Sequence, residues 1–239
     1  MRKQLRRAAA RLITYSYRFR ILGPFIWKHI TQPLELQWHV GDASRPASEQ
    51  YWKEVANLFE YFGFRADQFA NKVIVDIGAG SNPATTFFQD AKIIAIEPLA
   101  DRYLKEIPAC GLRQAHKIYS CPAETRLEEL KSAADFVISI NVLDHALGFD
   151  TIVENINYYL KPGSTAFLSF DSHDYIDIMH PTILNEEKCK KSFESVGLSI
   201  TKVSRGLGPP GSRPLACPGG FKYGHGEAMN FWLTKPDAG

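Results

Sequence analysis

Hydrophobic and polar positions alternate in blocks from residue 72 onward. Short runs rich in β-branched residues are separated by stretches whose apolar positions recur at helical spacing. The runs predict strands at Val73–Ile77, Ile93–Ile96, Lys117–Tyr119, Phe136–Ile140 and Ala166–Phe170. The other stretches predict helices at about 83–90, 99–107, 125–132, 150–160 and 185–196. Such alternation is typical of a mostly parallel sheet covered on both faces, that is, a doubly wound α/β domain.

Polar residues and a proline mark the expected starts of several of these helices. Thr125-Arg-Leu-Glu128 has the form of a capping box. Asp150 and Asn185 are the expected N-caps of the last two helices. Pro83 suits the first position of the helix that follows the first strand, because the N–H that proline lacks would be unpaired there.

The C-terminal part of the chain has a different pattern. Leu198–Ser204 and Ala228–Thr234 are expected strands with no helix between them, so they should pair in an antiparallel hairpin. This completes a seven-stranded sheet. Residues 206–226 join the two strands and contain seven glycines and four prolines. A loop of this length is more often functional or disordered than a plain connection.

The N-terminal 34 residues contain eight lysines and arginines and no acid. Their apolar and basic positions fall on opposite helical faces, which predicts a basic amphipathic helix that ends at Gly23-Pro24. This extension (1–34) could pack on its own domain or fray, lie on an anionic membrane surface through residues 1–22, or be a cleaved targeting peptide. Residues 35–47 look irregular, and Ser48 is the expected N-cap of a helix to about Phe64. Residues 35–70 are therefore interpreted as a helical lid on a domain that covers 35–239.

Composition sets limits on the class of protein. The chain has 239 residues, 45% of them hydrophobic, and a net charge of +2. This charge makes nucleic acid unfavoured as a general partner. The four cysteines match no zinc-binding spacing and are expected to be free thiols, as in a cytoplasmic protein. No apolar run approaches the roughly 18 residues that a membrane span requires.

The loop after the first strand contains the most informative motif. It is Gly78-Ala-Gly80-Ser-Asn-Pro83, where Pro83 replaces the third glycine of a dinucleotide fingerprint. Asp76 precedes the loop, and its carboxylate would repel a diphosphate but attract an ammonium group. Glu97 ends the second strand, where an acid can accept hydrogen bonds from ribose hydroxyls. Together these residues favour, as the ligand, a nucleoside that bears an amino acid over a dinucleotide.

In these residues the chain resembles the class I S-adenosylmethionine-dependent methyltransferases. The resemblance is good across residues 72–171 and loose across residues 172–235. The resemblance implies that S-adenosyl-L-methionine is the cofactor. It further implies that Asp76, Gly78 and Gly80 hold the methionine part, that Glu97 binds ribose, and that Pro98 and Leu99 flank adenine. Ser81-Asn82-Pro83 departs from the further glycine of many members.

Two later segments complete the cofactor site that the resemblance implies. Pro122-Ala123-Glu124 would cover the adenine edge through Ala123 and Glu124. Ile140-Asn141-Val142-Leu143-Asp144-His145 would face the methyl group, with Asn141 on the cofactor. Leu160-Lys-Pro-Gly163 would introduce the fifth strand. Other roles remain open: Asp76 could cap its loop, Glu97 could be a solvated strand end, and Asn141, Asp144 and His145 could cap the next helix.

Ligands of such sheets bind where the strands end, so the segments after strands four and five are expected to face the acceptor. His145 and His173 are the candidate bases, with Asp144 beside them, because histidine titrates near neutral pH. Other polar residues expected at this rim are Asp171, Asp174, His180, Arg213, Tyr223 and His225. Aspartates and histidines could also hold a divalent metal, but their spacing here is not diagnostic and no metal ligand is assigned.

The acceptor is left open by the sequence. An oxygen or nitrogen of a small molecule, sugar or lipid is favoured, because the chain has room only for a lid and one long loop beside its domain. The alternatives are an RNA or protein methyltransferase and a non-catalytic module that binds S-adenosylmethionine. A basic N-terminal helix on a membrane would favour a membrane-borne acceptor.

Overall fold

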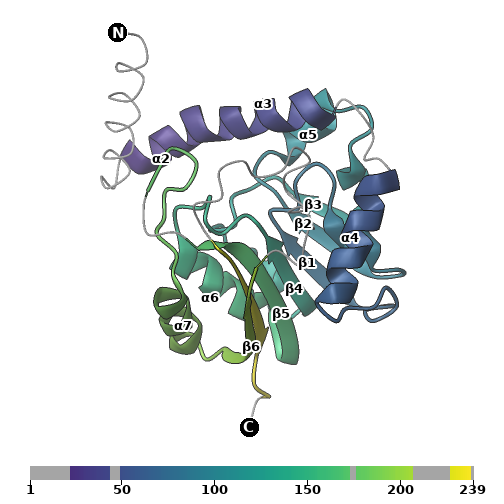
Figure 1. The fold of residues 1–239 in the computed structure, drawn as a ribbon, viewed down its shortest axis with the longest axis vertical. Helices are drawn as coiled ribbons and strands as arrows, with labels where there is room; N and C mark the ends of the chain where they lie inside the picture. The colour runs from purple at the N-terminus through teal and green to yellow at the C-terminus, as the bar shows by residue number, and fades with distance from the viewer. Residues whose placement is uncertain (1–21, 44–48, 173–175, 207–226, 238–239) are drawn as a thin grey trace.

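A computed structural model describes residues 22–43, 49–172, 176–206 and 227–237. Seven strands form one sheet in the order β3-β2-β1-β4-β5-β7-β6. The first five strands are parallel, and β7 runs antiparallel to both β5 and β6 (Figure 1). The strands are β1 (Val73–Ile77), β2 (Lys92–Ile96), β3 (Lys117–Tyr119), β4 (Ala134–Ile140), β5 (Leu160–Ser172), β6 (Ser199–Arg205) and β7 (Glu227–Thr234). The predicted fold class and the terminal hairpin are confirmed.

Helices cover both faces of the sheet (Figure 1). Successive residues of β1 point to opposite faces, so Ile74 packs in the cluster with α4 while Val75 packs in the cluster with α6 and α7. Burial on both sides explains why the central strands are apolar throughout. The helices of these layers are α4 (Glu49–Tyr61), α5 (Ala100–Glu106), α6 (Phe149–Tyr159) and α7 (Glu186–Ser195).

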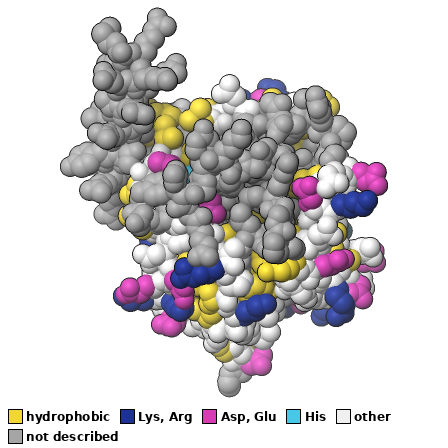
Figure 2. Space-filling view, viewed as in Figure 1, with side chains coloured by type: hydrophobic (Ala, Val, Ile, Leu, Met, Phe, Trp, Pro, Cys, Tyr) yellow, Lys and Arg dark blue, Asp and Glu magenta, His cyan; other side chains and the backbone are white. Residues whose placement is uncertain are grey.

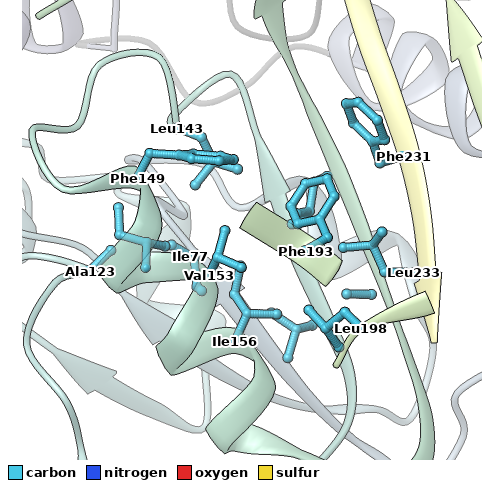
Figure 3. Packing of buried hydrophobic residues seen from close by; sticks show 14 of the residues in the cluster. Ile77, Ala123, Leu143, Phe149, Val153, Ile156, Phe193, Leu198, Phe231 and Leu233 are labelled. Atoms are coloured by element: carbon cyan, nitrogen blue, oxygen red, sulfur yellow. The ribbon is translucent and has the colours of Figure 1, made fainter. Parts of the chain in front are cut away.

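The largest core cluster lies between the sheet and the pair α6 and α7. In Figure 3, Ile156 of α6, Phe193 of α7 and Phe231 of β7 lie within this cluster. The rings of Phe193 and Phe231 meet edge to face at 5.1 Å. Each fully buried side chain of this size contributes about 1.5–3 kcal/mol relative to exposure. The cluster therefore anchors the antiparallel hairpin to the parallel part of the sheet.

Residues 22–43 form a continuous helix, which corrects two expectations. The helix consists of α2 (Leu22–Ile26), the π-helical segment η1 (Trp27–Thr31) and α3 (Gln32–Ala43). Helical structure passes through Gly23-Pro24, and residues 35–43 are helical rather than irregular. The Gln32 N–H donates to the Trp27 carbonyl five residues earlier, and this wider turn precedes Pro33, which has no N–H. The expected boundary at residue 34 lies inside this helix.

Two predicted helices are only single 3-10 turns. The segment 83–90 contains η2 (Ala84–Phe87), because the Gln89 N–H donates to Ala66 rather than to the helix. The segment 125–132 contains only η4 (Glu128–Leu130). The Tyr159 hydroxyl accepts a hydrogen bond from the Leu127 N–H and donates one to the Thr125 carbonyl, so these two groups are not available to an α-helix. The capping box therefore opens no α-helix. A further 3-10 turn is η3 (Gly111–Gln114).

The two predicted N-caps have different outcomes. The Asn185 side chain accepts from the Lys188 N–H at 2.9 Å, so its role as the N-cap of α7 is confirmed. The prediction for Asp150 is wrong, because α6 begins at Phe149 with Gly148 in the N-cap position. Ser48 lies outside the described residues. None of the described helices is long and apolar enough to cross a membrane, and Cys110, Cys121 and Cys189 are free thiols.

Candidate cofactor and acceptor site

The glycine loop begins where β1 ends, at the carboxyl edge of the sheet. Gly78 and Gly80 have φ angles of +72° and +62°, which L side chains rarely adopt. The Gly78 N–H donates to the Ile96 carbonyl at 2.8 Å, which ties the loop to β2. A Cβ on Gly78 would lie 2.2 Å from Cγ2 of Val142. Glycine is therefore required at position 78 by both its backbone angle and its neighbour.

Asp76 is a buried carboxylate in the middle of the sheet. Its Oδ2 accepts a hydrogen bond from the Thr85 hydroxyl at 2.5 Å. Burial raises the pKa of Asp76 to about 7, the Thr85 hydrogen bond opposes this rise, and the charge of Glu97 adds to it. A bound cation would stabilise the ionised form and offset the cost of burying it. The residue thus has the electrostatic properties expected of a partner for an ammonium group.

Glu97 follows the last residue of β2 and is buried, so the alternative of a solvated strand end is wrong. Its Oε2 accepts from the Gly80 N–H at 3.0 Å and its Oε1 from the Leu99 N–H at 2.9 Å. Burial raises the pKa of Glu97, although these two hydrogen bonds act to lower it. Each carboxylate oxygen has a second lone pair, so Glu97 could still accept two hydroxyl groups. The two backbone bonds fix the side chain beside the glycine loop.

The segment expected at the adenine edge also supports the fold. Oε1 of Glu124 accepts from the N–H groups of Leu147 and Gly148, at 3.2 and 3.0 Å. This carboxylate therefore stabilises the start of α6, where unpaired N–H groups attract negative charge. Ala123 is buried, and its carbonyl accepts from the Asn155 amide at 2.9 Å. Cofactor contact by Ala123, Glu124 and Pro98 stays a prediction.

The segment after β4 connects the glycine loop to a cluster of polar side chains. Asn141 has a φ of +56°, and its N–H donates to the Ser169 carbonyl at 2.7 Å. Non-glycine residues in this conformation often occur at functional sites. The next residue, Val142, packs on Gly78. The turn thus brings Asp144 and His145 to the same edge of the sheet as Asp76 and Glu97.

Asp144, His145 and His180 form a compact group, which we call the rim cluster. Asp144 is 0% exposed, and neither of its carboxylate oxygens has a hydrogen-bond partner among the described residues. Nε2 of His145 lies 3.7 Å and Nε2 of His180 lies 3.9 Å from Oδ2 of Asp144. Nδ1 of His145 is also buried, and it has no hydrogen-bond partner in the part of the chain that the structure describes. Buried polar atoms of this kind call for an explanation, since most are hydrogen-bonded.

Other acids surround the rim cluster. Burial raises the pKa of Asp171 to about 6, and the charge of Asp144 adds to this rise, while His180 and His145 oppose it. Glu35 interacts electrostatically with His145 and His180 from α3. For His180, burial acts to lower the pKa, but its hydrogen bond with Asp177 and the charge of Asp144 raise it overall. The cluster therefore lies in a negative environment that favours cations.

The helix over residues 22–43 lies across this edge of the sheet (Figure 1). The Trp27 indole N–H donates to the His145 carbonyl at 2.9 Å, and the Thr31 hydroxyl donates to the Ile178 carbonyl at 2.7 Å. Nδ1 of His39 lies 3.1 Å from the Ser81 hydroxyl next to the glycine loop. The helix thus contacts both halves of the site through Trp27, Thr31 and His39. The sequence signal was the spacing of four between Trp27, Thr31, Glu35 and His39, which was missed because prolines suggested helix ends.

Several residues expected at the rim cannot be placed. His173, Asp174, Arg213, Tyr223 and His225 lie outside the described residues, so the role of His173 as a base stays a prediction. Asp171, at the described end of β5, is electrostatically coupled to Asp144, as the shared edge of the sheet predicts. His180 joins the cluster from a segment with little regular structure. Its partner Asp177 was not foreseen.

Solved structures provide the comparison. No protein-family model and no curated protein sequence matches the chain. The [4+2]-cyclase SpnF aligns with a TM-score of 0.63 at 14% identity, over 87% of this chain and 96% of its own. Haemonchus contortus phosphoethanolamine N-methyltransferase 2, crystallised with S-adenosyl-L-methionine, aligns at 0.55 and 14% identity over 85% of this chain and 56% of its own.

A third structure has a different methyl acceptor. It is the 1,6-didemethyltoxoflavin-N1-methyltransferase of Burkholderia thailandensis, with bound S-adenosylhomocysteine. It aligns with a TM-score of 0.50 at 16% identity, over 79% of each chain. Identities this low establish architecture, and architecture alone does not assign a reaction. By its strand order, its terminal hairpin and these alignments, the chain has the fold of the class I S-adenosylmethionine-dependent methyltransferases.

Proposed function

We propose that the chain binds S-adenosyl-L-methionine and transfers its methyl group to an oxygen or nitrogen of a small-molecule, sugar or lipid acceptor. The observation that carries the proposal is the pair of buried carboxylates, Asp76 and Glu97, on either side of the Gly78–Gly80 loop. Two like charges buried this close need a ligand with both a cation and hydrogen-bond donors. The amino group and the ribose hydroxyls of S-adenosylmethionine meet this need.

The residues of the chain would act mainly by positioning. S-adenosylmethionine supplies a methyl group on a positively charged sulfur atom. Asp76 would hold the ammonium group, Glu97 the ribose, and the turn at Asn141 and Val142 would direct the reactive part toward the rim cluster. Correct alignment of two reactants alone can contribute about 7–11 kcal/mol to lowering a barrier. The helix over residues 22–43 would exclude water from the same edge.

An acceptor hydroxyl or ammonium must also lose a proton. His145 is the proposed base, with Asp144 3.7 Å from its Nε2 to stabilise the protonated imidazole. Asp171, with its pKa near 6, adds a second acid–base group in the same environment. His173, from the segment that follows β5, is proposed as an alternative base.

The small or lipid acceptor is preferred over RNA for a reason of charge. On the face in Figure 2, basic and acidic side chains of the described residues are interspersed and form no extended basic surface. Nucleic-acid-binding proteins usually concentrate lysine and arginine on one surface. Leu22 and Phe25, by contrast, are 46% and 59% exposed at the described start of the helix, next to exposed Lys28. This supports our proposal that residues 1–22 contact an anionic membrane from the cytoplasmic side.

The direct test is transfer of label from S-adenosylmethionine with an isotopically labelled methyl group. The full chain would be incubated separately with metabolite, lipid and RNA extracts, at a concentration of labelled S-adenosylmethionine well below the Kd expected for the Asp76→Asn variant, which serves as the control with weakened cofactor binding. Label in a metabolite or lipid fraction, and not with the variant, is the expected result. Label only in RNA would contradict the proposed acceptor class, and no label in any fraction would contradict methyl transfer.

A further inference from the structure

The rim cluster contains a buried carboxylate whose charge nothing in the described structure neutralises by direct hydrogen bonding. Both oxygens of Asp144 lack a hydrogen-bond partner among the described residues, although Asp144 is fully buried. Burying an ionised carboxylate without hydrogen bonds costs several kcal/mol. Proteins generally meet that cost with a cation or a metal ion. The imidazoles of His145 and His180, which lie next to Asp144, are therefore candidate co-ligands.

The distances in the rim cluster fit shared coordination better than hydrogen bonding. Charge-assisted N–H···O bonds measure about 2.7–2.9 Å. The two Nε2 atoms instead lie 3.7 and 3.9 Å from Oδ2 of Asp144. Two ligand atoms about 2.1 Å from a tetrahedral metal ion are separated by about 3.4 Å. All three candidate ligand atoms lie within 4.8 Å of one another, so side-chain shifts of about 1 Å or less would bring them into one coordination sphere.

His180 is oriented as a metal ligand by a second carboxylate. Its Nδ1 lies 2.9 Å from Oδ1 of Asp177, which also accepts the N–H groups of Met179 and His180 at 2.8 Å. Because an ionised carboxylate only accepts, Nδ1 must carry the proton, which leaves the lone pair on Nε2 when the ring is neutral. Ligating histidines commonly donate their other N–H to a carboxylate in this way. This contact is independent of the lack of hydrogen bonds at the Asp144 oxygens, and it points to the same site.

We propose that Asp144, His145 and His180 bind one divalent transition-metal ion, with Zn²⁺ as the representative ion. Two imidazoles and one carboxylate suit zinc and its neighbours rather than magnesium or calcium, which prefer oxygen ligands. The acids Asp171 and Glu35 add negative potential around the cluster. Three protein ligands leave a further coordination position for water or for an acceptor.

The position of the site suggests what the ion would do. The rim cluster is linked through Val142 to the glycine loop, so the ion would lie on the acceptor side of the proposed cofactor site. A hydroxyl oxygen bound to a divalent ion loses its proton more readily than the free hydroxyl. This role rests on the proposed methyl transfer, whereas metal binding itself does not. When the ion is bound, His145 is a ligand and the ion replaces the imidazole base proposed above for the metal-free chain. The acceptor proton then passes to water, and S-adenosylhomocysteine is the leaving group of the methyl transfer.

The test is isothermal titration calorimetry of the metal-stripped full chain with Zn²⁺. We expect one saturable site per chain, and a Kd at least about tenfold weaker in Asp144→Asn and His180→Gln. His116→Gln is the matched control, because exposed His116 precedes β3 at the opposite edge of the sheet and should leave the Kd unchanged. Titration with Co²⁺ should give absorption bands of a nitrogen- and oxygen-bound ion that Asp144→Asn loses.

Two further measurements keep the test decisive. Asp177→Asn leaves all three ligands in place but should weaken Zn²⁺ binding by about tenfold, because only the orientation of His180 changes. Binding of S-adenosylmethionine to each variant reports folding and the cofactor site separately. No saturable Zn²⁺ site in a chain that binds S-adenosylmethionine would overturn the metal proposal alone. Equal Zn²⁺ affinity in the original chain, Asp144→Asn and His180→Gln would overturn it as well.

Discussion

Replacing Asp76 with asparagine should make the free protein more stable and its cofactor binding weaker. The carboxyl group has an ordinary pKa of 3.8, and burial raises this pKa to about 7. The folded state therefore holds the proton more tightly than the unfolded state does. The contribution of this tightly held proton to the free energy of unfolding is fully present below pH 3.8, and it is lost as the pH rises to about 7. Above that pH the ionised group opposes folding.

The size of this effect follows from the pKa shift. A shift of about three units corresponds to about 4 kcal/mol at pH 8, as an upper bound. Asparagine keeps the acceptor for the Thr85 hydroxyl but adds an amide NH₂ that needs its own acceptor. If half of this upper limit is realised, the free energy of unfolding rises by about 2 kcal/mol. A gain of this size raises the Tm of a chain this long by about 4–8 °C. Loss of the charged partner of the ammonium group should meanwhile cost about 1.5–3 kcal/mol of binding free energy, or about 10- to 150-fold in Kd.

Thermal unfolding from pH 4 to pH 8 and calorimetry with S-adenosylmethionine measure the two effects. The difference in Tm between Asp76→Asn and the original chain should grow with pH and level off above about 7. Asp135→Asn is the control, and its change in Tm should have the opposite sign, that is, a lower Tm at pH 8. Burial acts to raise the pKa of Asp135, but Lys161 and the Val73 N–H lower it overall, so the ionised carboxylate stabilises the folded state. A lower Tm for Asp76→Asn at pH 8 would show that the buried charge does not destabilise the free protein, and an unchanged Kd would show that Asp76 does not bind the ammonium group.

Three other substitutions test separate parts of the site. Gly78→Ala should lose about 2–5 kcal/mol of stability in urea unfolding, because the backbone has a positive φ there and the new Cβ would clash with Val142. Gly197→Ala is the control: Gly197 has a similar φ but open space around it, so this variant should lose only about 1–2 kcal/mol. Glu97→Gln should weaken S-adenosylmethionine binding by at least about tenfold in calorimetry, since it removes a charged acceptor, while exposed Glu129→Gln should not; equal losses would contradict a role for Glu97. His145→Ala should leave cofactor affinity unchanged and lower the rate of label transfer by about 100-fold or more; full activity would remove His145 from the mechanism.

The sheet could be predicted from sequence because its strands are buried on both faces. Val73–Ile77 and Phe136–Ile140 consist almost entirely of apolar residues, and helices separate them at regular intervals. The N-terminal helix was less predictable, because Pro24 and Pro33 usually interrupt helices and a π-helical segment accommodates the chain between them. No α-helix forms at 83–90 or 125–132, because N–H groups of these segments donate to the distant Ala66 carbonyl and Tyr159 hydroxyl, which local patterns cannot reveal.

The candidate site was predictable only where it belongs to the sheet. Asp76, Gly78, Gly80 and Glu97 come directly from strand ends, so their order along the chain fixes their proximity. The contact between Asp144 and His180 depends instead on an irregular segment, and the orientation of His180 depends on Asp177, three residues earlier. Glu124 shows a further limit, since the same carboxylate that the family resemblance assigns to adenine also stabilises the start of α6.

Calorimetric titration of the full chain with S-adenosylmethionine is the direct test of cofactor binding. We expect one site per chain, competition by S-adenosylhomocysteine, and loss of most affinity in Asp76→Ala and Glu97→Ala. No heat of binding at about 1 mM ligand, equivalent to a binding free energy weaker than about −4 kcal/mol, would contradict this expectation.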